Sequence, residues 1–573
     1  MSNIIKSVLC VVSSVALLLL NDGQIYAQFP GSQPARVLHD DLSIRPLAEA
    51  PFEAVKLAYN KSDGFLYVIA RNGNLHRLNP ETGVMTGVQN ASHHGMSDTQ
   101  GLAISDEGVF YLVGNSTDRN VTRTNTAFVK RATINGNRWQ WETVMQTEPI
   151  PLSNTDFDHM INEVVISPDG QHLYINSGSR TDHGEVQSAG GLYPGLRESP
   201  LTGKILKIPT DATDLLLLND SDFLWNGGYI HVDGIRNSFG LAFNADGELF
   251  GSDNAGERDD PEELNWLKAG FHYGFPWYAG GNTNPMQFDG YDPSQDLLLT
   301  TDTRSEIFYN DPDFPPPPDT LVFKSPILNH GPDAVMYRDP ETGQIRNAAE
   351  EQIGLTSFTG HRSLLGLQFD ADSSFGAPYT GDAFILSFTG GNDMPFLLQH
   401  MDDDGEELLR LGWVRVGDDT YGVASTKIAD RFLNPIDSEI IGNKLFVMEF
   451  KTTWLNSFAT TRIWEITFPL NSPDTSLEPG EIVQSFQLYQ NYPNPFNPIT
   501  QINYSLDTST GVMLEVFDSM GRIVDVLVDG VQSAGHHSVA FNAANLPSGL
   551  YLYRLSLPGQ NNFNQTKKMM LVK

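Results

Sequence analysis

The sequence predicts an all-β protein in two parts, a six-bladed β-propeller over residues 28–470 and a small C-terminal β-sandwich over residues 484–573. Two observations lead to this prediction. A pattern of two alternating strands joined by a glycine-containing turn recurs along the first part. A polar stretch with proline and glycine, residues 471–483, then separates it from a differently patterned tail, as a linker does.

The N-terminus has the pattern of a secretory signal peptide over residues 1–27. Lys6 precedes an apolar run from Val8 to Leu20, and a polar stretch ends at Ala27. The run is shorter than the roughly 20 residues that a membrane-spanning helix needs. Cys10, the only cysteine, lies within it, so the mature protein has no disulfide and no thiolate metal site. We expect a soluble, exported protein.

The charge is strongly acidic and confined to the predicted propeller. The chain has 36 Lys and Arg against 70 Asp and Glu, a net charge of −34. The tail and the signal peptide are each balanced, so the excess lies in residues 28–483. Such a surface repels nucleic acid and anionic lipid, and we exclude both as partners. The acids are dispersed, which favours a solubilising surface over an acidic interaction tail.

Six copies of the repeated pattern predict six blades. A single hairpin with one apolar face cannot bury that face alone, and repetition around an axis solves the problem. The spacing between copies is irregular, which indicates elaborated loops between the blades. The copies begin at Val55, Gly101, Asn162, Gly240, Leu364 and Ser438.

The longest gap between copies, residues 276–350, is predicted to be a loop insertion. It contains four consecutive prolines, Pro315 to Pro318, which cannot lie in a central strand. The insertion could shape a substrate mouth, pack beside a neighbour, or serve only as structural filler.

The C-terminal ninety residues resemble a type IX secretion sorting domain. The resemblance rests on the segment Gln490 to Pro498, on Asp518 to Arg522, on Leu546 to Tyr551, and on the terminal Lys567-Lys568-Met569. It implies passage across an outer membrane by the type IX machinery, with release or attachment at the cell surface. A carbohydrate-binding sandwich is the alternative for this tail.

Three places in the predicted propeller carry unusual polar residues next to strands. His159 and Arg236 each immediately precede a predicted strand and so lie near one mouth, and the acidic run 253–263 follows another. Each alone has a structural explanation, as a loop hydrogen bond or a solvated turn. Together they indicate a base, a positive group and a cation site on one face.

The order and surroundings of these residues resemble the soluble pyrroloquinoline quinone (PQQ) dependent glucose and sorbosone dehydrogenases. The matching segments are His159 before NEVVISPDGQHLYINSG, GKILKIP from Gly203, GIRNSFGLAF around Arg236, the acidic loop ending in ELNWLKAGFHYGFPW, and GHRSLLGLQFD from Gly360. The resemblance covers most of residues 50–470.

This resemblance implies that a hydride leaves a sugar carbon bearing a hydroxyl and passes to PQQ. His159 would be the general base that takes the hydroxyl proton. Arg236 would stabilise charge on the quinone oxygen. The backbone carbonyls of Ala255 and Gly256 would hold a Ca²⁺ that polarises the quinone.

The resemblance also implies cofactor contacts and includes two departures, the first being that Ala255 and Gly256 replace a glycine-proline pair in the cation loop. Arg236, Arg362 and Asn254 would bind PQQ, whose three carboxylates need local positive charge. Where the family has an Asp that orients the base, this chain has Ser179. Asp182, three residues on, could take that place if the loop bends back. Without it, the rate falls or the protein lacks the activity.

Three functions therefore remain open. The first is an exported PQQ-dependent dehydrogenase for a sugar or polyol, passing electrons to an unknown acceptor. The second is a non-catalytic propeller that binds glycans or surface partners, which Ser179 favours. The third is a Ca²⁺-dependent lactonase, which would need one axial cation held by Asn, Asp and Glu side chains from several blades.

Overall fold

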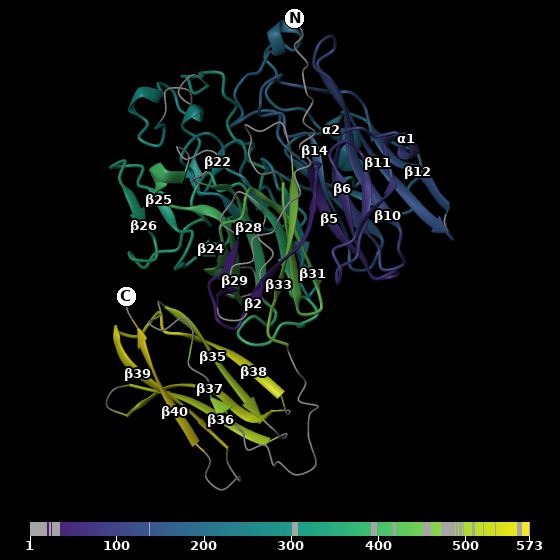
Figure 1. Ribbon diagram of the computed structural model, residues 1–573. Helices are drawn as coiled ribbons and strands as arrows, with labels where there is room; N and C mark the ends of the chain where they lie inside the picture. Colours follow the sequence, from purple (N-terminus) through teal and green to yellow (C-terminus); the bar gives the residue numbers. More distant parts are fainter. Residues whose placement is uncertain are drawn as a thin grey trace, which may run out of the picture.

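The computed structural model shows a chain whose regular structure is nearly all β (Figure 1). It describes residues 35–470 except 137, 301–306, 391–397, 416–419 and 451–459. In the tail it describes residues 487–571 except 489–490, 492–495, 497, 507–509, 519–520, 533–534 and 558–563. The predicted linker lies outside these residues, and so does the predicted signal peptide apart from a strand pair, β1 (Leu20–Asn21) and β2 (Gln24–Ile25).

The described part of residues 35–470 contains six sheets of three or more strands. The first three follow chain order. One comprises β5 (Ala54–Asn60), β6 (Phe65–Ala70), β7 (Leu75–Leu78) and β8 (Met85–Gln89). The next comprises β9 (Thr99–Ile104), β10 (Phe110–Asp118), β11 (Thr124–Asn135) and β12 (Arg138–Thr147), with β13 (Ile150–Pro151) and β17 (Leu215–Leu217). The third comprises β14 (Ile161–Ile166), β15 (His172–Ser177), β16 (Lys204–Pro209) and β18 (Ile230–Asp233).

The other three sheets complete the large part of the chain. One comprises β19 (Gly240–Phe243), β20 (Leu249–Asp253) and β21 (Glu263–Trp266). The next comprises β27 (Leu364–Phe369), β28 (Ala383–Gly390), β29 (Gly405–Arg415) and β30 (Tyr421–Asp430), with β3 (Arg36–Val37) and β24 (Leu328–Asn329). The last comprises β31 (Pro435–Ile441), β32 (Lys444–Glu449), β33 (Thr461–Thr467) and β4 (Ser43–Ala50).

One edge strand of each of the six sheets contacts the corresponding edge strand of the next sheet, and these contacts form a closed cycle. β5 contacts β9, β9 contacts β14, and the contacts continue through β19, β27 and β31 back to β5. The N-terminal strand β4 pairs antiparallel with β33, so the last sheet contains strands from both ends of the large part. Each hairpin forms where the sequence provides a tight turn. Gly64, Gly170 and Gly247 follow Asp at three of these turns and have φ of 75°, 69° and 75°.

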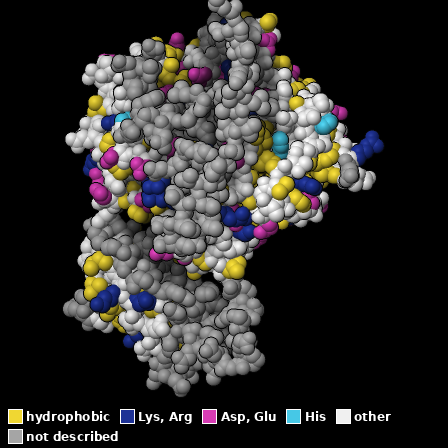
Figure 2. All heavy atoms as spheres, viewed as in Figure 1, with side chains coloured by type: hydrophobic (Ala, Val, Ile, Leu, Met, Phe, Trp, Pro, Cys, Tyr) yellow, Lys and Arg dark blue, Asp and Glu magenta, His cyan; other side chains and the backbone are white. Residues whose placement is uncertain are grey.

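Buried apolar residues from neighbouring sheets pack together between the sheets. Leu66, Val68 and Phe110 are completely buried in one such cluster, which also contains Ile436 of β31. On the face shown in Figure 2, acidic side chains are scattered among other types. Within the described residues, no helix has the length and apolar character needed to cross a bilayer.

The described part of residues 276–350 forms little regular structure, as the sequence predicts. The segment contains two small hairpins and short single-turn helices. These are β22 (Tyr278–Ala279) with β23 (Asn282–Thr283), β25 (Met336–Arg338) with β26 (Ile345–Asn347), η2 (Pro285–Gln287) and η3 (Pro293–Gln295). Among the other described residues, the helices are α1 (Ala91–His94), α2 (Ser221–Asn226), η1 (Ala189–Gly191) and η4 (Gln399–Met401).

The tail forms two sheets around its own core. One contains β34 (Gln487–Leu488), β35 (Ile499–Leu506) and β38 (Gly535–Asn542), and the other contains β37 (Ile523–Gln532), β36 (Thr510–Phe517), β39 (Gly549–Ser556) and β40 (Asn564–Leu571). Ile502 of the first sheet and Leu514 and Tyr553 of the second are completely buried in one apolar cluster.

Candidate functional site

His159 lies just before β14 and is held by the segment after β15. Its Nδ1 is 3.2 Å from both the carbonyl oxygen and Oγ of Ser179. The Ser179 hydroxyl donates to the carbonyl of Thr181 at 2.7 Å, so its oxygen presents a lone pair to the imidazole. This arrangement assigns the proton to Nδ1 of His159 and leaves Nε2 as the acceptor. Burial, together with the charge of Arg236, lowers the pKa of His159 to about 3.

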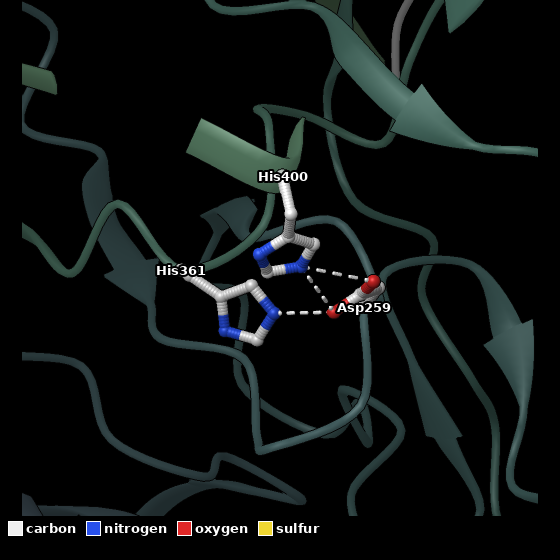
Figure 3. Close-up of side chains that lie close together, drawn as sticks. All are labelled: Asp259, His361 and His400. Carbon is white, nitrogen blue, oxygen red and sulfur yellow. Dashed lines mark hydrogen bonds and ion pairs between the residues drawn. The ribbon is translucent and has the colours of Figure 1, made fainter. Parts of the chain in front are cut away.

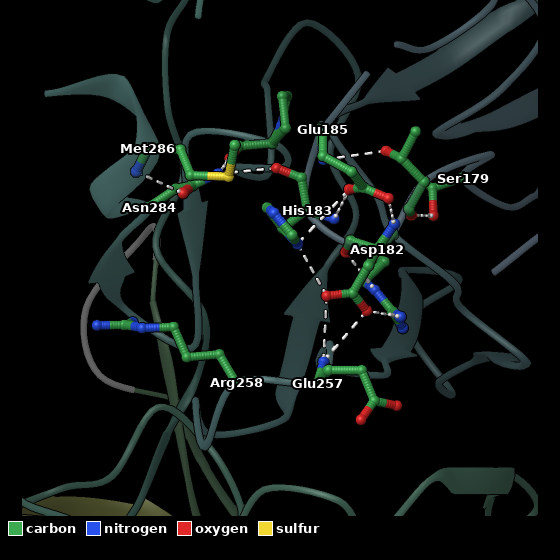
Figure 4. Close-up of polar contacts among 12 residues, drawn as sticks. Ser179, Asp182, His183, Glu185, Glu257, Arg258, Asn284 and Met286 are labelled. Atoms are coloured by element: carbon green, nitrogen blue, oxygen red, sulfur yellow. Dashed lines mark hydrogen bonds and ion pairs between the residues drawn. The ribbon is translucent and has the colours of Figure 1, made fainter. Parts of the chain in front are cut away.

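Asp182 does not take the place of the missing acid beside His159. It is completely buried, and its carboxylate pairs with Arg236, at 2.8 Å from Nη2 to Oδ1, and with His183, at 2.9 Å from Nδ1 to Oδ2 (Figure 4). Burial opposes ionisation of Asp182, but the charge of Arg236 and these hydrogen bonds hold its pKa below the usual range. His159 is therefore oriented by the uncharged Ser179.

Arg236 is fixed between two loops. Its Nε donates to the carbonyl of Asp182 at 2.8 Å, and its Nη1 donates to the carbonyl of Asn254 at 3.2 Å. The backbone supports it, because the Arg236 and Asn237 N–H groups donate to the carboxylate of Asp253. Three of the five guanidinium N–H groups are thus used by Asp182 and Asn254, and two remain for a ligand.

The loop after β20 presents a group of oxygens beside Arg236. The side-chain Oδ1 of Asn254 is buried and has no hydrogen-bond partner among the described residues. The next two residues are Ala255 and Gly256, the predicted cation ligands. A Cβ at Gly256 would lie 2.9 Å from both oxygens of Asp182, so only glycine allows this approach. An unsatisfied amide oxygen beside two backbone carbonyls is a donor set that suits Ca²⁺.

Arg236, Asn254, Ala255 and Gly256 all line one pocket. Its walls also include a second arginine, four acids (Asp182, Asp253, Asp260 and Glu263), and several aromatic or proline residues from the 276–350 insertion and the segment before it. The additional lining residues include Arg258, Asp253, Glu263, Tyr273, Phe275, Pro276, Tyr278, Asn284 and Phe308. The insertion therefore helps to form a ligand pocket. Flat aromatic walls beside the Arg236 guanidinium suit a planar anionic ligand, whereas Arg258 is already paired with Asp260 at 2.7 Å and with Asp296 at 2.8 Å.

Burial keeps part of the acidity of this pocket neutral. Burial raises the pKa of Asp253 to about 6, and burial with the nearby Asp253 charge raises the pKa of Glu263 to about 8. Burial therefore favours the neutral form of Glu263, which lowers the electrostatic cost of admitting an anionic ligand beside Arg236.

Arg362 does not line this pocket, contrary to the role expected for it. It is completely buried, its Nη1 and Nη2 pair with Glu407 and Asp403, and Nη1 also donates to Ser387 Oγ at 2.8 Å. Two carboxylates already neutralise its charge. Arg362 therefore acts as the centre of a buried ionic network rather than as a cofactor contact.

His183 is a pocket residue that the sequence interpretation missed. It stacks on Phe308, with ring centroids 3.7 Å apart, and its Nδ1 is bound to Asp182. Its Nε2 is buried and has no hydrogen-bond partner among the described residues. His183 directly follows Asp182 in the sequence, and this neighbour was the one available signal. A single histidine in a loop does not by itself indicate that its side chain faces a pocket.

A buried lysine lies among three of the strands that form the closed cycle. Lys56 of β5 is buried and pairs with Glu163 of β14 and, at 3.1 Å, with Oδ1 of Asp437 of β31. The backbone N–H of Leu57 donates to the other oxygen of Asp437 at 2.7 Å. An ammonium ion therefore occupies the place where a lactonase of this shape would need its cation, which disfavours that third hypothesis.

Comparisons with known proteins agree with the sequence interpretation. A family model described as glucose/sorbosone dehydrogenase matches residues 50–306, and one described as a secretion system C-terminal sorting domain matches residues 490–573. A search of curated proteins found no match. The resemblance of the two parts of the chain to these two families is thus confirmed.

Solved structures with similarity to this chain include three sugar dehydrogenases. The PQQ-bound aldose sugar dehydrogenase of Streptomyces coelicolor is 17% identical, with 77% of this chain and 99% of that chain covered and a TM-score of 0.43. The apo-form soluble aldose sugar dehydrogenase of Escherichia coli is 15% identical, with coverages of 74% and 99% and a TM-score of 0.45. The holo PQQ domain of pyranose dehydrogenase from Coprinopsis cinerea is 13% identical, with coverages of 76% and 98% and a TM-score of 0.46.

Proposed function

We propose that the chain is an exported quinoprotein dehydrogenase that oxidises a sugar or related alcohol, built as a six-bladed propeller with a C-terminal sorting sandwich. The observation that carries the proposal is the family match over residues 50–306, which includes His159, Arg236, Ala255 and Gly256. The closed cycle of six sheets supports the blade count. The tail match supports delivery by the type IX machinery, after export directed by the signal peptide.

The cofactor would lie in the pocket beside Arg236. When bound, PQQ supplies a hydride acceptor, and Ca²⁺ supplies Lewis-acid polarisation. Asn254, Ala255 and Gly256 would hold the cation, while Arg236 would meet the negative charge of the quinone. The sequence predicted all four as site residues, but it placed Asn254 at the cofactor and not at the cation.

The chemical role of His159 follows from its hydrogen bonds. Because Nδ1 carries the proton and donates to Ser179, Nε2 is free to accept the hydroxyl proton of the substrate as its carbon loses a hydride. The carbonyl and Oγ of Ser179 can orient the ring as an acid would. They cannot provide the negative charge that would stabilise the imidazolium, so this base is weaker than one paired with Asp.

Reconstitution tests the proposal directly. The purified protein, supplied with Ca²⁺ and PQQ, is expected to bind the quinone and to reduce a dye with at least one member of a panel of aldoses and polyols. Quinone binding is followed by absorbance and turnover by dye reduction. Binding without turnover on any substrate would support the glycan- or partner-binding alternative. Absence of quinone binding would overturn both the cofactor and the activity.

A Ser179→Asp substitution tests how the base is oriented. A carboxylate 3 to 4 Å from Nδ1 favours the imidazolium, so we expect the pKa of His159 to rise from about 3 towards 6. The base acts only when neutral. The acidic limb of kcat should therefore move to higher pH, while kcat at pH 8 rises by about tenfold. The control is Ser179→Asn, because asparagine has the shape of aspartate but carries no charge. A pH profile identical in the Asp and Asn variants would contradict the assignment.

A further inference from the structure

Three side chains of types that commonly bind metal ions lie close together beside the loop that follows β20, although they come from distant parts of the sequence. Asp259 lies in the loop after β20, His361 in the loop before β27, and His400 in η4. Oδ1 of Asp259 is 2.8 Å from Nε2 of His361 and 3.2 Å from Nε2 of His400 (Figure 3). The ligand atoms of the three residues all lie within 4.8 Å of one another.

We propose that Asp259, His361 and His400 bind one divalent transition-metal ion, of the class represented by Zn²⁺. Two imidazoles and a carboxylate form a ligand set that such ions prefer, whereas Ca²⁺ prefers oxygen ligands alone. Tetrahedral coordination at Zn–N and Zn–O distances of about 2.1 Å separates neighbouring ligand atoms by roughly 3.4 Å. The observed nitrogen–oxygen separations of 2.8 Å and 3.2 Å are shorter, so small side-chain movements that widen them would admit the ion.

The ligands are held by further contacts, as metal ligands in proteins commonly are. Nε of Arg338 donates to Oδ2 of Asp259 at 2.7 Å, while Oδ1 faces His361 and both oxygens lie 3.2 Å from Nε2 of His400. Nη2 of Arg338 also donates to the carbonyl of His400 at 3.2 Å. One guanidinium group therefore positions two of the three ligands.

The backbone that carries His361 is constrained. His361 and Ser363 have φ of 66° and 50°, a left-handed conformation that costs energy for residues with a side chain. Glu262 stabilises this turn, because its two carboxylate oxygens accept the N–H groups of Ser363 at 2.7 Å and Leu364 at 3.0 Å. The direction of the His361 side chain is thereby imposed by its surroundings.

One side of the cluster is accessible to solvent. Asp259 and His361 are buried, but the His400 side chain is 22% exposed. Thr300 Oγ1 lies 3.4 Å from Nε2 of His400 and 3.2 Å from Oδ2 of Asp259. A fourth ligand could therefore be this hydroxyl or a water molecule. The bound ion would tether the loop that carries Ala255 and Gly256 to the segments of His361 and His400. The proposal does not depend on the proposed redox function.

The experiment is a Zn²⁺ titration of the chelator-treated full-length protein against a competing chromophoric indicator. We expect one ion per chain with submicromolar affinity, and a higher thermal unfolding temperature in its presence. His361→Ala and His400→Ala should each weaken this binding by about 100-fold or more. His172→Ala, which removes an imidazole of β15 outside the cluster, is the matched control and should bind Zn²⁺ as the unaltered protein does.

Binding of Co²⁺ gives a second readout that does not depend on stability. The unaltered protein should show visible d–d absorption from nitrogen and oxygen ligands, and His400→Ala, which changes a partly exposed residue, should lose it. Equal Zn²⁺ binding by the unaltered protein and by the His361→Ala/His400→Ala double variant would overturn the proposal. Displacement of the bound ion by equimolar Ca²⁺ would also overturn it.

Discussion

Replacing His159 with glutamine is expected to lower kcat by about 10²- to 10⁴-fold while leaving the affinity for PQQ unchanged. Glutamine can keep the hydrogen bond to Ser179 but cannot accept a proton. His159 is not among the residues that line the pocket beside Arg236, so the quinone should bind as before. Dye-reduction kinetics measure the first effect, and titration of the quinone by absorbance measures the second.

The same experiment separates the two imidazoles near Arg236. His183 also has a buried Nε2 with no hydrogen-bond partner among the described residues, and its Nδ1 is bound to the carboxylate of Asp182. If His183→Gln abolishes turnover and His159→Gln does not, the base is His183 and the resemblance has misassigned it. His231→Gln is the control, because that half-buried imidazole is bound to the carbonyl of Leu267 at 3.0 Å and does not line the pocket.

Local patterns predicted the hairpins but could not predict which strand pairs with β33, the last strand of the large part of the chain. The copies beginning at Val55, Gly101 and Asn162 correspond to β5, β9 and β14, because alternation and Asp–Gly turns act over a few residues. β4 has no such repeat partner in the sequence. Its place beside β33 depends on a pairing across about 400 residues, which no local signal records.

The same limit explains which of the predicted site residues lie close together in the structure. Arg236, Asn254, Ala255 and Gly256 meet because a single hairpin, β19 with β20, separates them, and a short pattern captures this. Asp182 was assigned to His159 from its nearness in sequence alone. Its actual partners include Arg236, which approaches from the next sheet, and a strong buried ion pair decides where the carboxylate points.

The network around Arg362 provides the largest expected effect on stability. Arg362 is completely buried between Asp403 and Glu407, whose own positions follow only from the packing of β27 against β28 and β29. Arg362→Met keeps most of the side-chain volume but removes the charge. Two buried carboxylates then lose their counter-ion, and only Glu407 retains another cation, Lys427, at 3.1 Å.

We expect Arg362→Met to reduce the free energy of unfolding by about 3–5 kcal/mol at pH 7, measured by urea denaturation. Burial disfavours the charge of Asp403, but Arg362 holds its pKa below the usual value, so the pair stabilises the fold at neutral pH and loses this contribution as pH falls. The deficit of the variant should therefore persist at pH 5 and shrink only below the usual carboxyl pKa of 3.8. Arg431→Met, at an exposed arginine, should change stability by less than about 0.5 kcal/mol.

Adding Asp403→Asn and Glu407→Gln to Arg362→Met should restore part of the loss, since neither carboxylate is then left buried without its counter-ion. A deficit that neither low pH nor these neutral partners reduces would show that packing, and not charge, is the role of Arg362.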